Sequence, residues 1–182
     1  MALDEQLARI ASAAAGFAAP GEEVAGVVAV EPLGRRVFLC AYSSGDGHAW
    51  LALDGDARPL DDRRLVREAA SLAALCEVAE ESAGGGDVPE LRARLAELRE
   101  REAPQGIEEA EDAAAALAGT LAPEPRVASS AYLDAIGAAS RRLEQALGED
   151  ARSPFTAAMQ SALPAVEELT ADVERNYKGP LA

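Results

Sequence analysis

Apolar and polar positions alternate along this chain with two different periods, and the change of period predicts its elements. From residue 2 to 15 the apolar residues recur at helical spacing, namely Leu3, Leu7, Ile10 and Ala14. A short Val-rich run at 24–31 then predicts a strand. Residues 37–54 hold two more apolar runs around the turn segment 43–47, which is typical of a β-hairpin. Together these runs predict a three-stranded antiparallel meander.

The chain after the meander is patterned for helices. A helix is expected from Asp61 or Asp62, both suited to the N-cap position, to about residue 82. Four further helices are expected at about 88–102, 106–121, 129–147 and from residue 153, the last one kinked by Pro164. The expected fold class is α+β and predominantly helical, with an N-terminal helix, the meander and then about five helices packed as a helical bundle.

A glycine-rich stretch at 83–87 has the composition of a hinge and divides the chain. We expect an α+β portion at 1–83, with the first helix, the meander and a central helix. A helical portion at 84–182 follows, packed with the first as one globular unit. The helix after the hinge carries a narrow stripe of Leu91, Leu95 and Leu98 among charged residues, which suits an exposed helical arm.

The hairpin contains the only Trp and the only His of the chain. The expected register pairs Tyr42 with His48 and Cys40 with Trp50, which places the aromatic residues of both strands on one face. A slip of one residue would scatter them over two faces. The candidate ligand-binding residues on this aromatic face are Phe38, Cys40, Tyr42, His48 and Trp50.

The first strand is expected to add to the opposite, aliphatic face. Pairing of Val30 with Val37 places Val24, Gly26 and Val28 there as well. Both faces of the sheet are then apolar, whereas an antiparallel sheet usually keeps one face in water. The second face must therefore be covered as well, and three covers are possible: the C-terminal helices of the same chain, a second copy of the chain, or a ligand.

The charge of the chain limits its partners. The net charge is −15 and the pI is about 4.4. Such a chain repels nucleic acids and anionic membrane surfaces, so we expect neither as a partner. The ordinary explanation for the acidity is solubility, and the alternative is docking on a basic protein partner.

No stretch of the sequence indicates export or membrane insertion. The N-terminus has early acidic residues and no long apolar core, and no run approaches the length of a membrane span. We therefore expect a cytoplasmic protein. Cys40 and Cys76 lie in apolar runs and are expected to be buried, reduced thiols, with a disulfide between them as the alternative.

His48 is the one candidate general base, with Cys40 or a Ser as nucleophile and Asp46 or Asp54 as the orienting carboxylate. A lone His at the start of a strand is more often structural, so we expect no catalytic role. One His and two distant Cys are too few for a zinc site. The segment 54–56 lacks the Glu of a calcium loop, so we expect a turn there, and neither metal nor cofactor.

These observations favour a non-enzymatic, intracellular interaction or structural module. We expect a homo-oligomer that self-associates through an apolar sheet face or the helical arm. The alternative is a small-molecule binding or sensing domain, with its pocket between the aromatic face and the C-terminal helices. The observation that separates these hypotheses is what covers Trp50: the chain itself, a second chain or an empty cleft.

Overall fold

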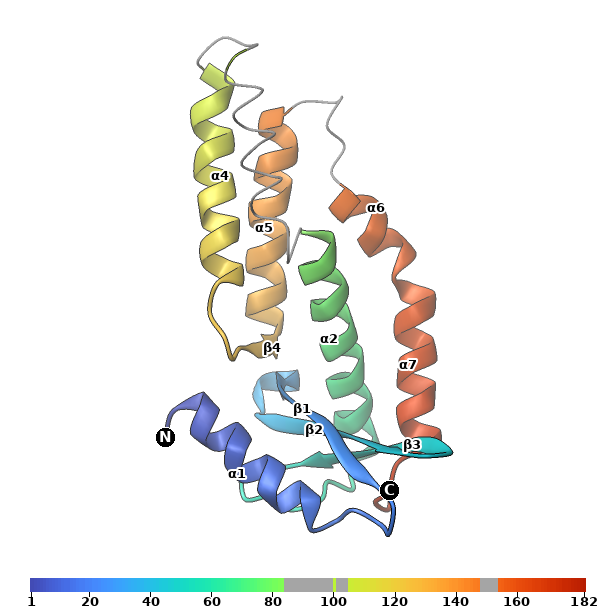
Figure 1. The fold of residues 1–182 in the computed structure, drawn as a ribbon. Coiled ribbons are helices and arrows are strands. Elements are labelled where there is room, and N and C mark those ends of the chain that lie inside the picture. The colour runs from blue at the N-terminus through green and yellow to red at the C-terminus, as the bar shows by residue number, and fades with distance from the viewer. Residues whose placement is uncertain (84–99, 101–104, 148–153) are drawn as a thin grey trace. The chain divides into compact units, whose positions relative to one another are not determined.

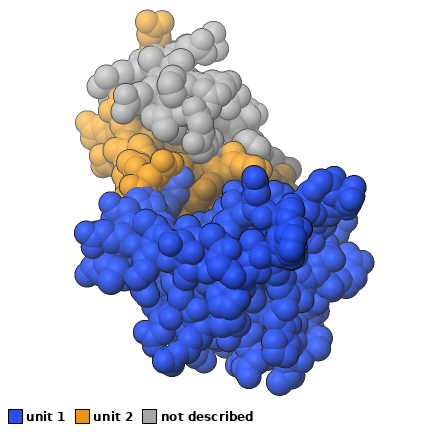
Figure 2. Space-filling model, turned by 60° about the horizontal axis from the view of Figure 1, so that its bottom comes forward, with its two compact units in different colours: residues 1–74, 125–130, 164–182 blue, residues 75–124, 131–163 orange. Residues whose placement is uncertain are grey.

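The structure is a computed structural model that describes residues 1–83, 100, 105–147 and 154–182. The chain forms two compact units that interleave along the sequence (Figure 2). Unit 1 comprises residues 1–74, 125–130 and 164–182, and unit 2 comprises residues 75–124 and 131–163. The predicted hinge glycines and the predicted leucine stripe of the helical arm lie outside the described residues. The expected division of the chain at residue 83 stays a prediction.

Unit 1 is built on a four-stranded mixed sheet with the order β3-β2-β1-β4 (Figure 1). Its strands are β1 (Glu23–Glu31), β2 (Val37–Ser44), β3 (Gly47–Leu53) and β4 (Val127–Ser129). The α+β class is confirmed, and the antiparallel β1-β2-β3 meander forms as predicted. The three-stranded sheet is wrong by one strand, because β4 pairs in parallel with the end of β1. A strand of three residues is too short to show a period of two.

The register of the hairpin differs by one residue from the expectation. Tyr42 pairs with Ala49 and Ala41 with Trp50, because only Gly45 and Asp46 lie between the paired ends of β2 and β3. Two-residue loops are the commonest hairpin connections, whereas the predicted pairing needs three residues in the loop. The slip moves every β3 side chain to the other face relative to β2.

The pairing of β1 with β2 was predicted correctly at one end. Val30 pairs with Val37, so Gly26 and Val28 share the face of Val37. The register shifts between Val24 and Gly26, and Val24 pairs with Tyr42 instead. A β-bulge of one extra residue reverses the side on which the following side chains lie. Val24 therefore belongs to the opposite face, which corrects the prediction for this residue.

We name the two faces by these side chains. Face A carries Phe38, Cys40, Tyr42 and Leu51, and it packs against the helix α1 (Leu3–Ala15) through Ile10 and Ala14. Face B carries Val30, Val37, Leu39 and Ala52, all nearly fully buried, together with Trp50 and His48. The short 3₁₀ turn η1 (Pro32–Gly34) joins β1 to β2, with Leu33 and Gly34 in the left-handed region at φ 53° and 73°.

The helices α2 (Arg63–Ser82) and α7 (Leu163–Arg175) are among the segments at which the chain passes between unit 1 and unit 2. The helix α2 begins in unit 1, and the Asp62 carboxylate caps it by accepting the N–H of Leu65 at 3.1 Å. The predicted last helix is divided into α6 (Pro154–Ser161) and α7. The kink predicted at Pro164, which lacks an N–H group, is instead a complete break that lies at Ala162.

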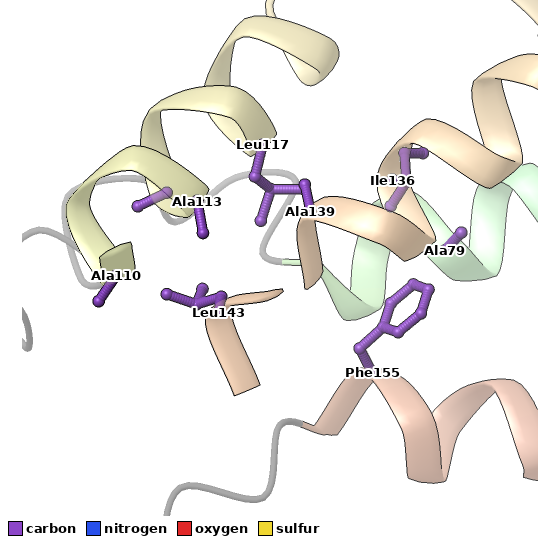
Figure 3. Close-up of a cluster of buried hydrophobic side chains, with 9 residues drawn as sticks. Ala79, Ala110, Ala113, Leu117, Ile136, Ala139, Leu143 and Phe155 are labelled. Atoms are coloured by element: carbon purple, nitrogen blue, oxygen red, sulfur yellow. The ribbon is translucent and has the colours of Figure 1, made fainter. Parts of the chain in front are cut away.

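Unit 2 contains the end of α2 with α4 (Gln105–Leu121), α5 (Ser130–Leu147) and α6. Its core is lined mainly by alanines, with Leu117, Ile136, Leu143 and Phe155 among them (Figure 3). Phe155 of α6 points toward Ala79 of α2 in this view. Small side chains let these helices approach closely, as the alanine-rich composition predicts. The helices at 106–121 and 129–147 are confirmed within one residue.

Candidate functional site

The five predicted site residues lie on two different faces of the sheet. Phe38, Cys40 and Tyr42 belong to face A, and His48 and Trp50 belong to face B. The structure therefore does not bring them together on one aromatic face. The physical reason is the two-residue hairpin loop, which sets the register of β3 against β2.

The three residues on face A are core residues beneath α1. Phe38, Cys40 and Tyr42 are nearly fully buried. The Tyr42 hydroxyl donates a hydrogen bond of 2.8 Å to the carbonyl of Ala14 in α1. Burial raises the pKa of the Cys40 thiol to about 12. A thiol with this pKa is protonated at neutral pH and is a poor nucleophile.

The two residues on face B meet a carboxylate from α7 that the sequence did not point to. Asp172 Oδ2 accepts a hydrogen bond of 3.0 Å from Trp50 Nε1 and lies 2.6 Å from His48 Nε2. Its other oxygen, Oδ1, accepts a 2.8 Å hydrogen bond from the side-chain amide of Asn176. We call these four residues the Asp172 cluster, and it joins α7 to the edge strand β3.

The hydrogen bonds of the cluster favour the ionised carboxylate. Burial by itself would raise the pKa of Asp172, but hydrogen bonds from Trp50 and then His48 outweigh it, and the pKa lies below its ordinary value. The Asp172 side chain is only 20% exposed, and that of His48 is 53% exposed. The cluster thus connects α7 to β3 through polar groups, and the imidazole ring of His48 faces solvent.

The Asp172 cluster has part of the geometry of a catalytic pair, because a carboxylate orients a histidine in it. The predicted partners Asp46 and Asp54 do not fill this role. Ser43 pairs with His48 across the hairpin, but no hydrogen bond joins these two described side chains. Cys40 lies on the other face. Cys40, the first nucleophile candidate, is therefore not placed beside His48.

The C-terminal residues of the chain pair with the backbone of Trp50 along the strand edge, and the Trp50 residue stays half-buried. The N–H of Trp50 donates to the carbonyl of Asn176 at 2.9 Å, and the N–H of Lys178 donates to the carbonyl of Trp50 at 2.8 Å. Tyr177 forms an isolated parallel bridge with Trp50 and donates its hydroxyl to the carbonyl of Leu60 at 2.6 Å. These residues protect the edge of β3. The one available sequence signal was that Lys178 is the only Lys.

One corner of face B stays open. Val28 is 47% exposed, and a Cβ atom built on Gly26 would meet nothing within 4 Å. Ala41 pairs with Gly26 and with Trp50, so these three residues form one row of the sheet, and Ala41 and Trp50 are half-buried. We call Gly26, Val28, Ala41 and Trp50 the open patch.

The open patch has a polar rim on one side. Glu23, Ser43 and His48 form the next row of the sheet, and all three are exposed. An exposed apolar patch with a polar rim is typical of a protein-binding surface. The patch is therefore the candidate binding site of unit 1.

The other predicted features have ordinary structural roles. In the segment 54–60, Asp54 Oδ1 accepts the N–H groups of Asp56 and Arg58 at 2.8 and 2.9 Å, so the predicted turn is confirmed. Among the described residues, no three His, Cys, Asp or Glu side chains are grouped to hold a metal ion. Cys40 and Cys76 are both buried, and no disulfide joins these two described residues.

None of the described helices is both long enough and apolar enough to cross a membrane. No protein-family model, no curated protein and no solved structure matches the chain.

Proposed function

We propose that this protein acts by binding protein chains, in the first place a second copy of itself, and not by catalysis. The observation that supports this most is the open patch. Val30, Val37, Leu39 and Ala52, which lie on the same face, are covered, while the neighbouring apolar corner is exposed. A partner that covers Val28 and the space over Gly26 would remove this apolar surface from water.

The chemistry of the rare residues supports a binding role over an enzymatic one. The Cys40 thiol is buried and protonated at neutral pH. His48 is held by a carboxylate whose two oxygens already accept hydrogen bonds from Trp50 and Asn176. The hydrogen bonds of Asp172 connect α7 and Asn176 to the sheet.

A second copy suits the open patch because the patch itself is uncharged. Two chains of net charge −15 repel each other at long range. Gly26, Val28, Ala41 and Trp50 add nothing to that repulsion, and Glu23 is the single acidic residue among the three rim residues. The patch is therefore a place where two acidic copies approach each other with few like charges in contact.

The substitution Val28→Asp tests this proposal. Burying an unpaired carboxylate in an apolar interface costs enough to weaken a dimer about tenfold or more. The matched control is Leu33→Asp, which adds the same charge at an exposed apolar residue outside the patch. Sedimentation equilibrium of chains that have not been unfolded should find a rapidly reversible, concentration-dependent dimer for the natural chain and the control, and no rapidly reversible dimer for Val28→Asp. A natural chain that stays monomeric at high concentration contradicts self-association.

The salt dependence of binding distinguishes a second copy from a basic protein as the partner. Added salt screens the repulsion between two acidic copies, so self-association through the patch should strengthen as ionic strength rises. Binding of a basic protein partner should weaken under the same conditions. Weakening of the dimer with added salt would therefore count against the second copy as the occupant.

A small-molecule pocket is the alternative function, and it has less support. It was expected to be lined by five residues on one face, and only His48 and Trp50 of these lie on face B. Phe38, Cys40 and Tyr42 already pack against α1. A ligand would have to bind at the open patch, in competition with the proposed partner chain.

A further inference from the structure

Unit 1 is completed by residues that come last in the chain. We call Pro164–Ala182 the C-terminal segment, which unit 1 contains together with residues 1–74 and 125–130. Its α7 residue Asp172 holds Trp50 and His48, and its residues 176–178 lie along the edge of β3. At its end, the N–H of Ala182 donates to the carbonyl of Asp61 at 2.7 Å. The segment is thus bound along its length by groups of the N-terminal part.

The side chain of Lys178 is bound by three groups of the N-terminal part of the chain. Its Nζ donates to the carboxylate of Glu22 and, at 2.7 Å, to the carbonyl of Phe17. The same atom lies 4.2 Å from the centre of the Tyr42 ring, in cation–π geometry. The Lys178 and Glu22 side chains are only 18% and 19% exposed. The hydrogen bond from Lys178 is the main cause that lowers the pKa of Glu22.

The connection between this segment and α6 is a short interruption of the helix. Ala162 is the single non-helical residue between α6, which ends at Ser161, and α7, which begins at Leu163. Pro164 follows and cannot donate a backbone hydrogen bond, so the two helices do not fuse into one. The boundary between units 2 and 1 lies at this break. Rotation about a few bonds here would redirect the whole segment without breaking a helix.

We propose that two copies of this chain exchange their C-terminal segments and form a swapped dimer. Each unit 1 would then be completed by α7 and residues 176–182 of the other copy. The contacts of the segment with unit 1 are kept in the exchanged form, with Glu22, Phe17, Trp50 and Leu60 as the receptor groups. Exchange of an identical element is a low-cost route to a dimer, because no new surface has to evolve. This mode does not use the open patch.

A pair of charge reversals tests the exchange in full-length chains. Glu22→Lys and Lys178→Glu each place like charges together within their own chain. When the two variants exchange segments, both receptor sites regain opposite charges. The expected result is a heterodimer that exceeds the homodimers of either variant about tenfold or more, since like charges in a partly buried pair are strongly disfavoured. Differently tagged chains, refolded together and then separated by tandem affinity steps, measure this.

The matched control carries both substitutions in one chain, which restores an opposite pair without a partner. It should dimerise like the natural chain and show no preference for either single variant. A second measurement does not depend on the folding of the variants: natural chains with two different tags, refolded together, should yield mixed dimers. These should equilibrate slowly, because α7 must leave unit 1 before it can exchange.

Two results would overturn the exchange. The first is the absence of mixed dimers both from the variant pair and from refolded natural chains. The second is a dimer that forms equally well in every combination of variants and is lost in Val28→Asp. That second result would place self-association at the open patch and leave the proposed function intact. Persistence of the variant heterodimer in a Val28→Asp background is the result that the exchange predicts.

Discussion

The carboxylate of Asp172 is the acceptor shared by Trp50, His48 and Asn176. One aspartate therefore connects the only Trp and the only His of the chain to α7. Nothing in the sequence around residue 172 distinguishes it from Glu168 or Glu174 on the same helix. Its role follows from the register of β3, which presents Trp50 and His48 on face B. A sequence pattern that fails to specify this register cannot identify Asp172.

The lowered pKa of Asp172 predicts how the stability of unit 1 depends on pH. Because the folded pKa lies below the ordinary value of 3.8, the carboxylate stabilises the folded state fully above that value. This contribution is lost as the pH falls through the lower folded pKa. Asp172→Asn should reduce the free energy of unfolding at neutral pH by about 1.5 kcal/mol or more, the usual contribution of a hydrogen bond to a charged group. The variant should also lose less stability than the natural chain below pH 4.

Urea unfolding followed by far-ultraviolet circular dichroism at a series of pH values measures this difference. Glu168→Gln is the matched control, because Glu168 is an exposed carboxylate on the same helix. The control should follow the natural chain at every pH. Equal acid dependence of Asp172→Asn and the natural chain would contradict the stabilising role of the Asp172 carboxylate.

At the scale of elements, long periodic segments were predictable and short or loop-defined features were not. The helices at 2–15, 106–121 and 129–147 follow from their apolar spacing and are confirmed within one or two residues. The strand β4 has three residues and shows no pattern of its own. The hairpin register depends on whether two or three residues form the loop, and both lengths suit the Gly and Asp residues there. Because the loop length was predicted wrongly, the five candidate site residues were expected on one face, whereas they lie on two.

The start of α2 offers a test at this scale, because the sequence placed the cap at Asp61 or Asp62. The Asp62 carboxylate accepts the Leu65 N–H, so Asp62→Ala should lower the free energy of unfolding by about 1 kcal/mol. Asp61→Ala is the matched neighbour and should change it by less than about 0.5 kcal/mol. Urea unfolding curves give both values. A larger loss for Asp61→Ala would mean that the cap is assigned to the wrong residue.

At the scale of the whole molecule, neither compact unit is one continuous segment of the chain. Residues 75–124 and 131–163 form unit 2, while unit 1 takes its pieces from the beginning, the middle and the end of the chain. Hydrophobic periodicity predicts each piece but contains no information on which pieces pack together. The C-terminal residues 176–178 show this, since only the folded chain reveals that they pair with Trp50 at the edge of β3. The proposed exchange of C-terminal segments between copies uses the same interleaving.

The proposed binding role depends on whether a second chain covers the open patch. Trp50 belongs to this patch and is the only Trp of the chain, so its fluorescence reports on the patch without any label. A partner that covers Val28 and Gly26 would take the neighbouring indole ring further out of water. Removal of that partner by dilution would return the ring to a more polar environment, which shifts its emission to longer wavelengths.

The most direct measurement is therefore the Trp50 emission maximum during serial dilution from the highest soluble concentration. The account predicts a shift to longer wavelengths in the natural chain and in Leu33→Asp. It also predicts that Val28→Asp has the long-wavelength emission at every concentration. An emission maximum that stays constant on dilution of the natural chain, and equals that of Val28→Asp, would contradict the claim that this protein self-associates through the open patch.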